Sequence, residues 1–380
     1  MFETNYLNTS SLSVLWPCLF WPFFLAMIFV SIFTPGIVKL AKRAGLLDPC
    51  NDRKVHSTPI PRLGGVVFII SAVLSFLMTS ASDIFSDEFV YQIQSNILEL
   101  FALYSATAIM FFIGFKDDLV GAKYSHKFVA QFISAGILVY MGLRINSLQG
   151  IVGIYELSPL FSIPLSLIII VLIINSINLI DGIDGLAASI CIIALISYTY
   201  IFLKSGNIVY ASICLCICGS VIPYIYFNIT GGKDKKNKLF MGDSGSLSLG
   251  ILMAFMSLKI LNLPISNNIA TNENTIILAF TPLIVPCFDL VRVFGYRISK
   301  HKSPFTPDKN HIHHKLLKVG LNQHQALICI ILFTILCMCI NISLSSLIDI
   351  NFLVLLDVIL WMIPNLMLTR FINKIVKEDG

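Results

Sequence analysis

Long apolar runs separated by short polar stretches dominate the chain. A helix of about 20 apolar residues crosses the hydrocarbon core of a bilayer. Inside lipid the backbone has to satisfy its own hydrogen bonds, which selects helices. The pattern therefore predicts an all-α integral membrane protein, a single polytopic domain (1–380) with about eleven transmembrane helices. The expected spans are 13–38, 63–81, 96–115, 127–146, 158–180, 186–203, 208–227, 244–261, 274–296, 325–343 and 352–371.

Lys and Arg are concentrated in alternate loops, chiefly at 39–62, 116–127, 233–238 and 292–318. The intervening loops contain very few of them. Because basic loops stay in the cytoplasm, we expect the N-terminus outside, the C-terminus inside and an odd number of spans. The net charge of +5 then reflects membrane topology, and no nucleic-acid partner is expected.

The composition excludes a soluble enzyme. Hydrophobic residues make up 56% of the chain and charged residues 12%, whereas a soluble domain carries about 25% charged residues. The first span lacks a basic leading region and a cleavage site, so we expect a retained helix rather than a signal peptide. The ten cysteines form no disulfide or zinc pattern and are expected to pack as small hydrophobes.

Acidic residues collect at the cytoplasmic ends of several expected spans. Asp117 and Asp118 are adjacent at the end of the third span. Neighbouring carboxylates raise each other's pKa unless a cation lies close by. The pair therefore indicates a bound divalent metal or a phosphate-transfer role, with an ordinary solvated helix end as the alternative.

Asn175, Asn178, Asp181 and Asp184 recur at every third position where the fifth span ends. In a continuous helix the first and last of them would point in opposite directions. A glycine follows each Asp, which predicts that the helix breaks there and that both acids lie on a short turn. Polar capping of a helix end is the alternative.

A further acid, Asp243, begins the eighth span within a run of small residues. A carboxylate at this position suits Mg²⁺, which takes one or two carboxylates together with substrate phosphate oxygens. Phe240 offers a ring that can stack on a planar base. The alternative is a plain helix start with Ser244 as its N-cap.

Three histidines, His311, His313 and His314, lie in the long loop after the ninth span. No Cys or fourth ligand is near them in sequence, so we expect contacts with phosphate or sugar oxygens rather than a zinc site. The first cytoplasmic loop contains Arg53 and Lys54. Basic side chains beside a membrane can hold a lipid phosphate, although topology alone would also explain their charge.

Taken in order from Asp48 to Lys315, these motifs resemble the polyprenyl-phosphate N-acetylhexosamine-1-phosphate transferases. Pro307-Asp308 followed by His-Ile-His-His is similar to the branch that starts common antigen and wall teichoic acid, and eleven spans fit that branch. The alternative within the family is the phospho-MurNAc-pentapeptide transferase, whose members tend to show three consecutive histidines and ten spans.

The resemblance implies a reaction. The enzyme would transfer an N-acetylhexosamine-1-phosphate, by default GlcNAc-1-phosphate, from a UDP-N-acetylhexosamine to undecaprenyl phosphate, and would release UMP. This is the first membrane step of a cell-surface polysaccharide such as O-antigen. The resemblance also implies Mg²⁺ as cofactor with Mn²⁺ as a substitute, a bacterial inner-membrane location with a cytoplasmic active site, and a homodimer.

The resemblance further implies roles for individual residues. Asp243 would be the main metal ligand, with Asp118 or Asp181 second. Asp117 would act as a base on the lipid phosphate or help to position it. The alternative is that Asp117 is a nucleophile in a two-step path, and these options stay open. Residues expected to contact the substrates are Asn175, Asn178, Asp184, Phe240, Arg297, His311, His313, His314, Arg53 and Lys54.

A transporter is the alternative from a different class. Its acids should lie near the bilayer midplane on broken helices. Here the acids lie mainly at one face, and the deeper ones are Asp357 in the last span and Glu99 near an outer end. We expect Asp357 to be paired or to lie near the interface rather than to line a conduction path.

Overall fold

A computed structural model describes residues 9–48, 60–82, 87–232, 236–263, 275–303 and 310–378. Most of them are helical. The elements, in chain order, are α1 Thr9–Arg43, β1 Leu47–Asp48, β2 Ile60–Pro61, α2 Gly64–Ser80, α3 Asp87–Ser95, α4 Ile97–Val120, α5 Tyr124–Tyr140, η1 Ile151–Gly153, α6 Pro159–Ile180, α7 Leu186–Lys204, α8 Ile208–Thr230, α9 Gly242–Leu261, α10 Thr275–Phe280, η2 Thr281–Leu283, α11 Ile284–Ser299, α12 Ile312–Lys318, α13 Gln323–Leu344 and α14 Ile350–Glu378.

The predicted all-α membrane class is confirmed. Among the described residues, nine helices are long and apolar enough to cross a membrane, and α2 is a shorter apolar helix. Each expected span overlaps at least one helix. The expected span 274–296 is not one continuous α-helix, because a 3-10 turn at Thr281–Leu283 separates α10 from α11. Pro282 within that turn has no N–H to donate, which favours such a break.

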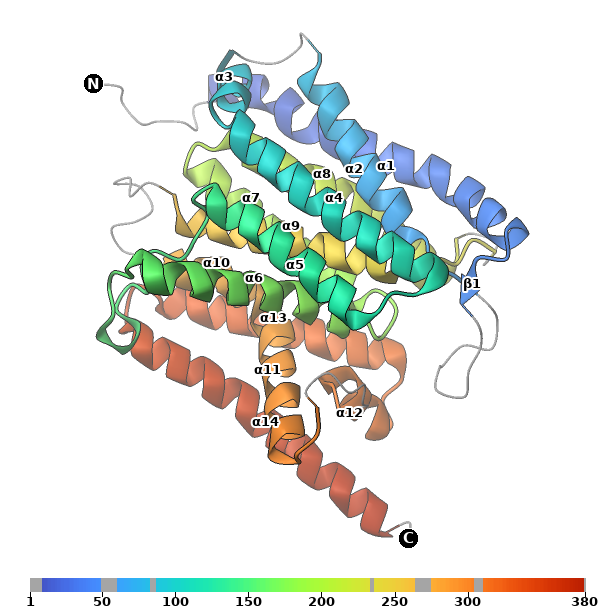
Figure 1. Cartoon of the computed structure of the whole chain (residues 1–380), viewed down its shortest axis with the longest axis vertical. Helices are drawn as coiled ribbons and strands as arrows, with labels where there is room; N and C mark the ends of the chain where they lie inside the picture. Colours follow the sequence, from blue (N-terminus) through green and yellow to red (C-terminus); the bar gives the residue numbers. More distant parts are fainter. Residues whose placement is uncertain are drawn as a thin grey trace.

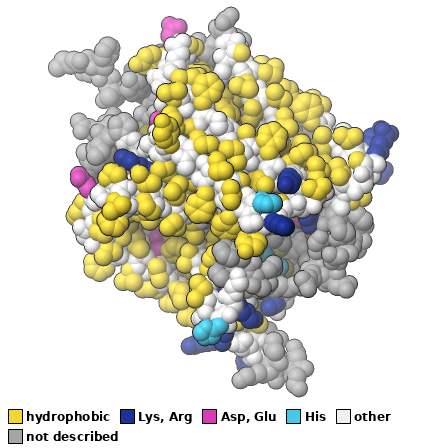
Figure 2. All heavy atoms as spheres, in the orientation of Figure 1, with side chains coloured by type: hydrophobic (Ala, Val, Ile, Leu, Met, Phe, Trp, Pro, Cys, Tyr) yellow, Lys and Arg dark blue, Asp and Glu magenta, His cyan; other side chains and the backbone are white. Residues whose placement is uncertain are grey.

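The helices form a bundle with α9 at its centre (Figure 1). α9 packs against α2, α4, α6 and α7, while α1 packs against α2 and α8. Helices at the periphery expose large apolar side chains, such as Ile32 on α1, Leu332 on α13 and Phe352 on α14. Apolar side chains cover most of the face in Figure 2, as expected where lipid rather than water surrounds the molecule.

α1 begins at one end of the bundle and α14 finishes at the opposite end (Figure 1). This arrangement agrees with an odd number of spans, while the side of the membrane on which each end lies stays a prediction. Asp357 on α14 accepts a hydrogen bond of 2.8 Å from Asn341 on α13. The deep acid is therefore paired, as expected.

Candidate active site

The polar turn between α6 and α7 is built around two residues with special backbone roles. α6 ends at Ile180 with Asp181 as its C-cap, and Gly185 adopts a left-handed conformation (φ 78°) just before α7. The predicted helix break is thus confirmed. Asn228 on α8 accepts a hydrogen bond from the Gly185 N–H at 2.7 Å and donates to the carbonyl of Leu239 at 2.9 Å. One buried amide therefore ties this turn to the segment before α9.

The segment before α9 is held by backbone pairing with the start of α2. The Phe240 N–H donates to the Pro61 carbonyl at 2.9 Å, and the Phe240 carbonyl accepts from the Gly64 N–H at 2.8 Å. A Cβ on Gly64 would lie 2.6 Å from that carbonyl oxygen, closer than real Cβ atoms approach. The glycine is therefore required for this close approach, which holds Phe240 beside the site.

The C-terminal end of α4 meets the N-terminal end of α9. The two carboxylate oxygens of Asp118 accept hydrogen bonds from the backbone N–H groups of Asp243 (2.8 Å) and Ser244 (2.9 Å). A residue of α4 therefore caps the start of α9, whose helix dipole favours an anion there. The alternative interpretation of Ser244 as N-cap is wrong, because α9 begins at Gly242 and Ser244 lies within its first turn.

Lys127, in the first turn of α5, bridges two of the acids. Its Nζ lies 3.0 Å from a carboxylate oxygen of Asp117 and also forms an ion pair with Asp243. Sequence reasoning treated this lysine only as part of a basic loop. One signal was available, since a cation in the first turn of a helix opposes the helix dipole and so indicates a compensating acid nearby.

The two asparagines of α6 lie in different surroundings. Asn178 donates to Asp243 Oδ1 at 3.3 Å and to Ser246 Oγ at 2.8 Å, so it belongs to the acidic cluster. Asn175 instead exchanges hydrogen bonds with Gln131 on α5, at 2.8 and 3.2 Å. One helical turn therefore separates a residue of the site from one that joins α6 to α5.

Asp181 and Asp184 differ in how their charge is balanced. Asp184 forms an ion pair of 2.6 Å with Lys238. Burial of the Asp181 carboxyl, with further repulsion from Asp243 and Asp184, raises its pKa to about 8. A buried acid surrounded by other acids is a group whose ionisation a bound cation would favour.

The donor chemistry of this cluster fits Mg²⁺, which prefers carboxylate and phosphate oxygens. Asp118, Asp181 and Asp243 supply such oxygens from α4, the α6–α7 turn and α9. In the parts of the chain that the structure describes, no three acidic, His or Cys side chains converge closely enough to hold an ion as they stand. The ammonium of Lys127 lies between Asp117 and Asp243, so an ion bound to Asp243 would require this ammonium to move away.

The histidine segment packs onto the acidic turn. His313 lies against Gly182, where an added Cβ would overlap the imidazole, and only 1% of His313 is exposed. Burial, together with the charges of His314 and His311, lowers the pKa of His313 to about 3. His313 is therefore neutral at physiological pH, and its ring lies against Gly182, the residue that follows Asp181.

A second buried cluster fixes the start of α12. Asp289 on α11 contacts His311 Nδ1 at 2.8 Å and accepts from the Ile312 N–H at 3.2 Å. Arg292 binds the same carboxylate at 2.6 Å and the Asn310 carbonyl at 2.6 Å. Sequence reasoning did not select Asp289 or Arg292 as site residues. They hold His311, which was selected, in a buried position.

The remaining predicted residues are placed as follows. Arg297 is buried near the end of α11, with 4% of its surface exposed. His314 is half-buried in α12, and its ring centroid lies 4.3 Å from that of His313. Arg53 and Lys54 lie outside the described residues, so their lipid-phosphate role stays a prediction.

Comparison with known proteins places this cluster in a family context. A family model described as glycosyl transferase family 4 matches residues 100–261, which include the three parts of the chain that carry the acids, namely α4, the α6–α7 turn and the start of α9. Decaprenyl-phosphate N-acetylglucosaminephosphotransferase of Mycobacterium tuberculosis is 31% identical over 320 residues, covering 80% of this chain and 76% of that protein. The probable undecaprenyl-phosphate N-acetylglucosaminyl 1-phosphate transferase of Bacillus subtilis is 30% identical over 312 residues, covering 82% and 80%. The undecaprenyl-phosphate alpha-N-acetylglucosaminyl 1-phosphate transferase of Yersinia pestis is 28% identical over 314 residues, covering 80% of each chain.

Proposed function

This chain belongs to the polyprenyl-phosphate N-acetylhexosamine-1-phosphate transferases, and we propose that it transfers GlcNAc-1-phosphate from UDP-GlcNAc to undecaprenyl phosphate. The observation that carries the proposal is the similarity over four-fifths of the chain to relatives named for this transfer. The clustering of Asp117, Asp118, Asp181 and Asp243 at one end of the bundle supports it. We place the site at the cytoplasmic face of the bacterial inner membrane, where a soluble UDP-sugar and a lipid phosphate can meet.

In the proposed reaction, an oxygen of the lipid phosphate attacks the sugar-bearing phosphorus of UDP-GlcNAc. A new P–O bond forms, the bond from this phosphorus to the bridging oxygen breaks, and UMP leaves with the electron pair. The second pKa of a phosphate monoester is about 6, so the lipid phosphate is largely dianionic at neutral pH. It needs little help from a base, and Asp117 serves mainly to position the reacting groups through its contact with Lys127.

Phosphoryl transfer between two anions depends on positioning and on neutralisation of charge. Asp243, with Asp181 or Asp118 second, would hold Mg²⁺, which neutralises the charge that develops on the leaving UMP. Lys127 places its ammonium next to Asp243. When the ammonium moves away from this carboxylate, it can pair with a phosphate oxygen of the substrate. Mn²⁺ would substitute for Mg²⁺, because it accepts the same oxygen ligands.

The other residues of the cluster shape the pocket for the donor. Asp118 keeps the first turn of α9 in place through two backbone N–H groups. Asp184 and Asn178 would hydrogen-bond uracil or ribose, and Phe240 would stack on uracil. Neutral His313 can donate one N–H to the diphosphate or sugar. His311, His314 and Arg297 would contact the same groups of the donor. Arg53 and Lys54 would hold the lipid phosphate.

The test uses purified protein, undecaprenyl phosphate and UDP-GlcNAc labelled in the sugar, with Mg²⁺ or with EDTA. Label should enter the lipid phase together with an equal amount of UMP, and EDTA should abolish both. Release of UDP would contradict the reaction, because the sugar would then move without its phosphate. UDP-MurNAc-pentapeptide should not react, and transfer from it would assign the chain to the other branch.

If neither donor reacts, UDP-GalNAc and other UDP-N-acetylhexosamines follow in the same assay. Transfer from one of them would change the sugar and keep the reaction class. An Asp243→Asn variant removes the charge of the proposed metal ligand and keeps the shape of the side chain. It should lose Mg²⁺-dependent transfer. Failure with every donor would refute the proposed function.

A further inference from the structure

A basic pocket lies at the C-terminal end of α1, away from the acidic cluster. It has a volume of about 430 Å³ and is lined by Pro35, Val38, Lys39, Lys42, Arg43, Lys236 and Asn237. Four of these residues are Lys or Arg and none is acidic. Pockets of this volume hold small ligands or headgroups, so the charge of the lining selects an anion.

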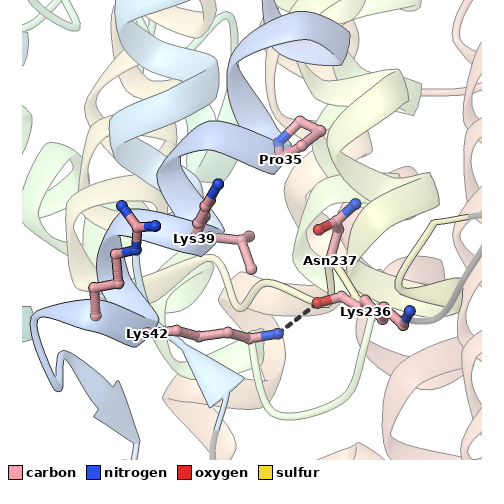
Figure 3. A pocket seen from close by; sticks show the side chains of 7 residues that line it. Pro35, Lys39, Lys42, Lys236 and Asn237 are labelled. Carbon is pink, nitrogen blue, oxygen red and sulfur yellow. Dashed lines mark hydrogen bonds between the residues drawn. The ribbon is translucent and has the colours of Figure 1, made fainter.

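The pocket is a built feature and not only a run of basic residues in a loop. Lys42 reaches from α1 across to the segment before α9 and donates a hydrogen bond of 2.6 Å to the Lys236 carbonyl. Figure 3 shows this side chain along one edge of the pocket, with Pro35 and Asn237 above it. Asn237 is fixed in turn by a backbone bond to the Gly231 carbonyl at 2.9 Å. Two elements distant in sequence thus face each other with positive charge between them.

The position of the pocket favours a lipid over a soluble anion. Three of its four cations, Lys39, Lys42 and Arg43, lie on α1. The same helix exposes the apolar side chains of Ile32, Phe33 and Leu40, which are 64%, 42% and 60% exposed. Figure 2 shows Lys and Arg side chains gathered where this apolar surface ends. Pro35 and Val38 continue the apolar surface into the pocket. A ligand there would place its anionic group on the cations and its hydrocarbon against α1, which is the arrangement of a phospholipid.

We propose that this pocket binds the headgroup phosphate of an anionic membrane phospholipid at the cytoplasmic interface. Basic pockets between helices on this side of a membrane suit such headgroups. The same segment that forms the pocket rim at Lys236 also places Lys238 on Asp184 and leads into α9. A bound lipid would therefore steady the segment that borders the acidic cluster.

The test measures lipid binding by native mass spectrometry of the full-length protein in detergent, titrated with phosphatidylglycerol or phosphatidylcholine. The wild type should retain phosphatidylglycerol in preference to phosphatidylcholine. A Lys39→Gln/Lys42→Gln/Lys236→Gln variant should lose roughly a hundredfold in affinity, since each cation near the surface contributes about a fivefold factor. This readout needs no transfer reaction, so its failure would leave the proposed function standing.

The matched control removes three exposed cations elsewhere, Lys300→Gln/Lys318→Gln/Arg370→Gln. It should bind phosphatidylglycerol like the wild type. An equal loss in this control would overturn the proposal, because net charge alone would then explain binding. Equal retention of phosphatidylcholine would overturn it as well, because binding would then not depend on an anionic headgroup. Displacement by inorganic phosphate at low concentration would mean a free-anion site. Stronger, pocket-dependent binding of undecaprenyl phosphate would assign the pocket to the acceptor lipid.

Discussion

Replacing Gly182 with Ala should uncouple the histidine segment from the acidic turn. The new Cβ would lie 2.6 Å from Cε1 of His313 and nearer still to its Nε2. The imidazole cannot move aside freely, because only 1% of His313 is exposed and its ring packs against those of His311 and His314. Overpacking of this kind typically costs about 1–3 kcal/mol of stability.

The effect on activity should exceed the effect on stability. If His313 donates to the donor substrate, a shift of about 1 Å in its ring would lower transfer by about a hundredfold. Unfolding in mixed detergent micelles measures the stability change, and UMP release at saturating UDP-GlcNAc measures activity. Gly136→Ala in α5 is the matched control, since a Cβ there meets no heavy atom within 4 Å. We expect it to leave activity unchanged and stability unchanged or slightly higher.

A double-mutant cycle isolates the contact. In a His313→Ala background the Gly182→Ala change should cost little stability, because the ring that it strikes is gone. A full cost of 1–3 kcal/mol in that background would refute the reasoning, since the destabilisation would then come from the backbone of the turn. Wild-type activity in the single Gly182→Ala variant would show that the position of His313 does not matter for transfer.

Three further outcomes are expected. Lys127→Met should reduce UMP release on the order of a hundredfold in the same assay, because its two carboxylate partners lose their shared cation; near-normal turnover would remove this lysine from the site. Asn228→Ala should lower the free energy of unfolding by about 1–3 kcal/mol, because it leaves the Gly185 N–H without its acceptor, and Asn228→Asp should lose less. The pKa of His313 is about 3 in the folded protein and about 6.5 in the unfolded chain. As the pH falls below 6.5, the unfolded chain therefore takes up a proton that the folded protein does not, and the free energy of unfolding should fall by roughly 2 kcal/mol between neutral pH and pH 5. Unfolding measured at both pH values should show a smaller fall in His313→Leu, and an equal fall would contradict the assignment.

The fold could be predicted from the sequence to the level of its helices, because lipid allows the backbone few alternatives. Apolar runs marked every span, and the paired glycines marked the break between α6 and α7. The expected span 274–296 is present as Thr275–Ser299, but the hydropathy pattern did not indicate the interruption inside it. The 3-10 turn at Thr281–Leu283 lies inside a stretch whose hydropathy alone reads as one helix, and only its prolines indicate the interruption.

The candidate site could be predicted as a set of acids but not as a set of pairs. Hydrophobic pattern and spacing report on neighbours within one element, whereas Asp118 and Asp243 are 125 positions apart in the chain. Asp289 was not among the predicted site residues, and its contact with His311 shows that it holds this histidine. Lys127 was passed over because the charge of a basic loop already had an explanation in topology.

The acid pair at the end of α4 shows why contacts, rather than residue types, divide the roles. Successive residues on a helix point about 100° apart, so neighbouring carboxylates meet different elements. Asp118 turns toward α9 and holds its first backbone N–H groups, while Asp117 turns toward α5 and holds Lys127. By capping α9, Asp118 also fixes the backbone of Asp243, which lies in the first turn of that helix. Asp118 therefore supports the backbone of Asp243, and Asp117 shares the cation Lys127 with it. Because both acids of the pair are connected to Asp243, we infer that Asp243 is the carboxylate best placed to meet a metal-bound phosphate.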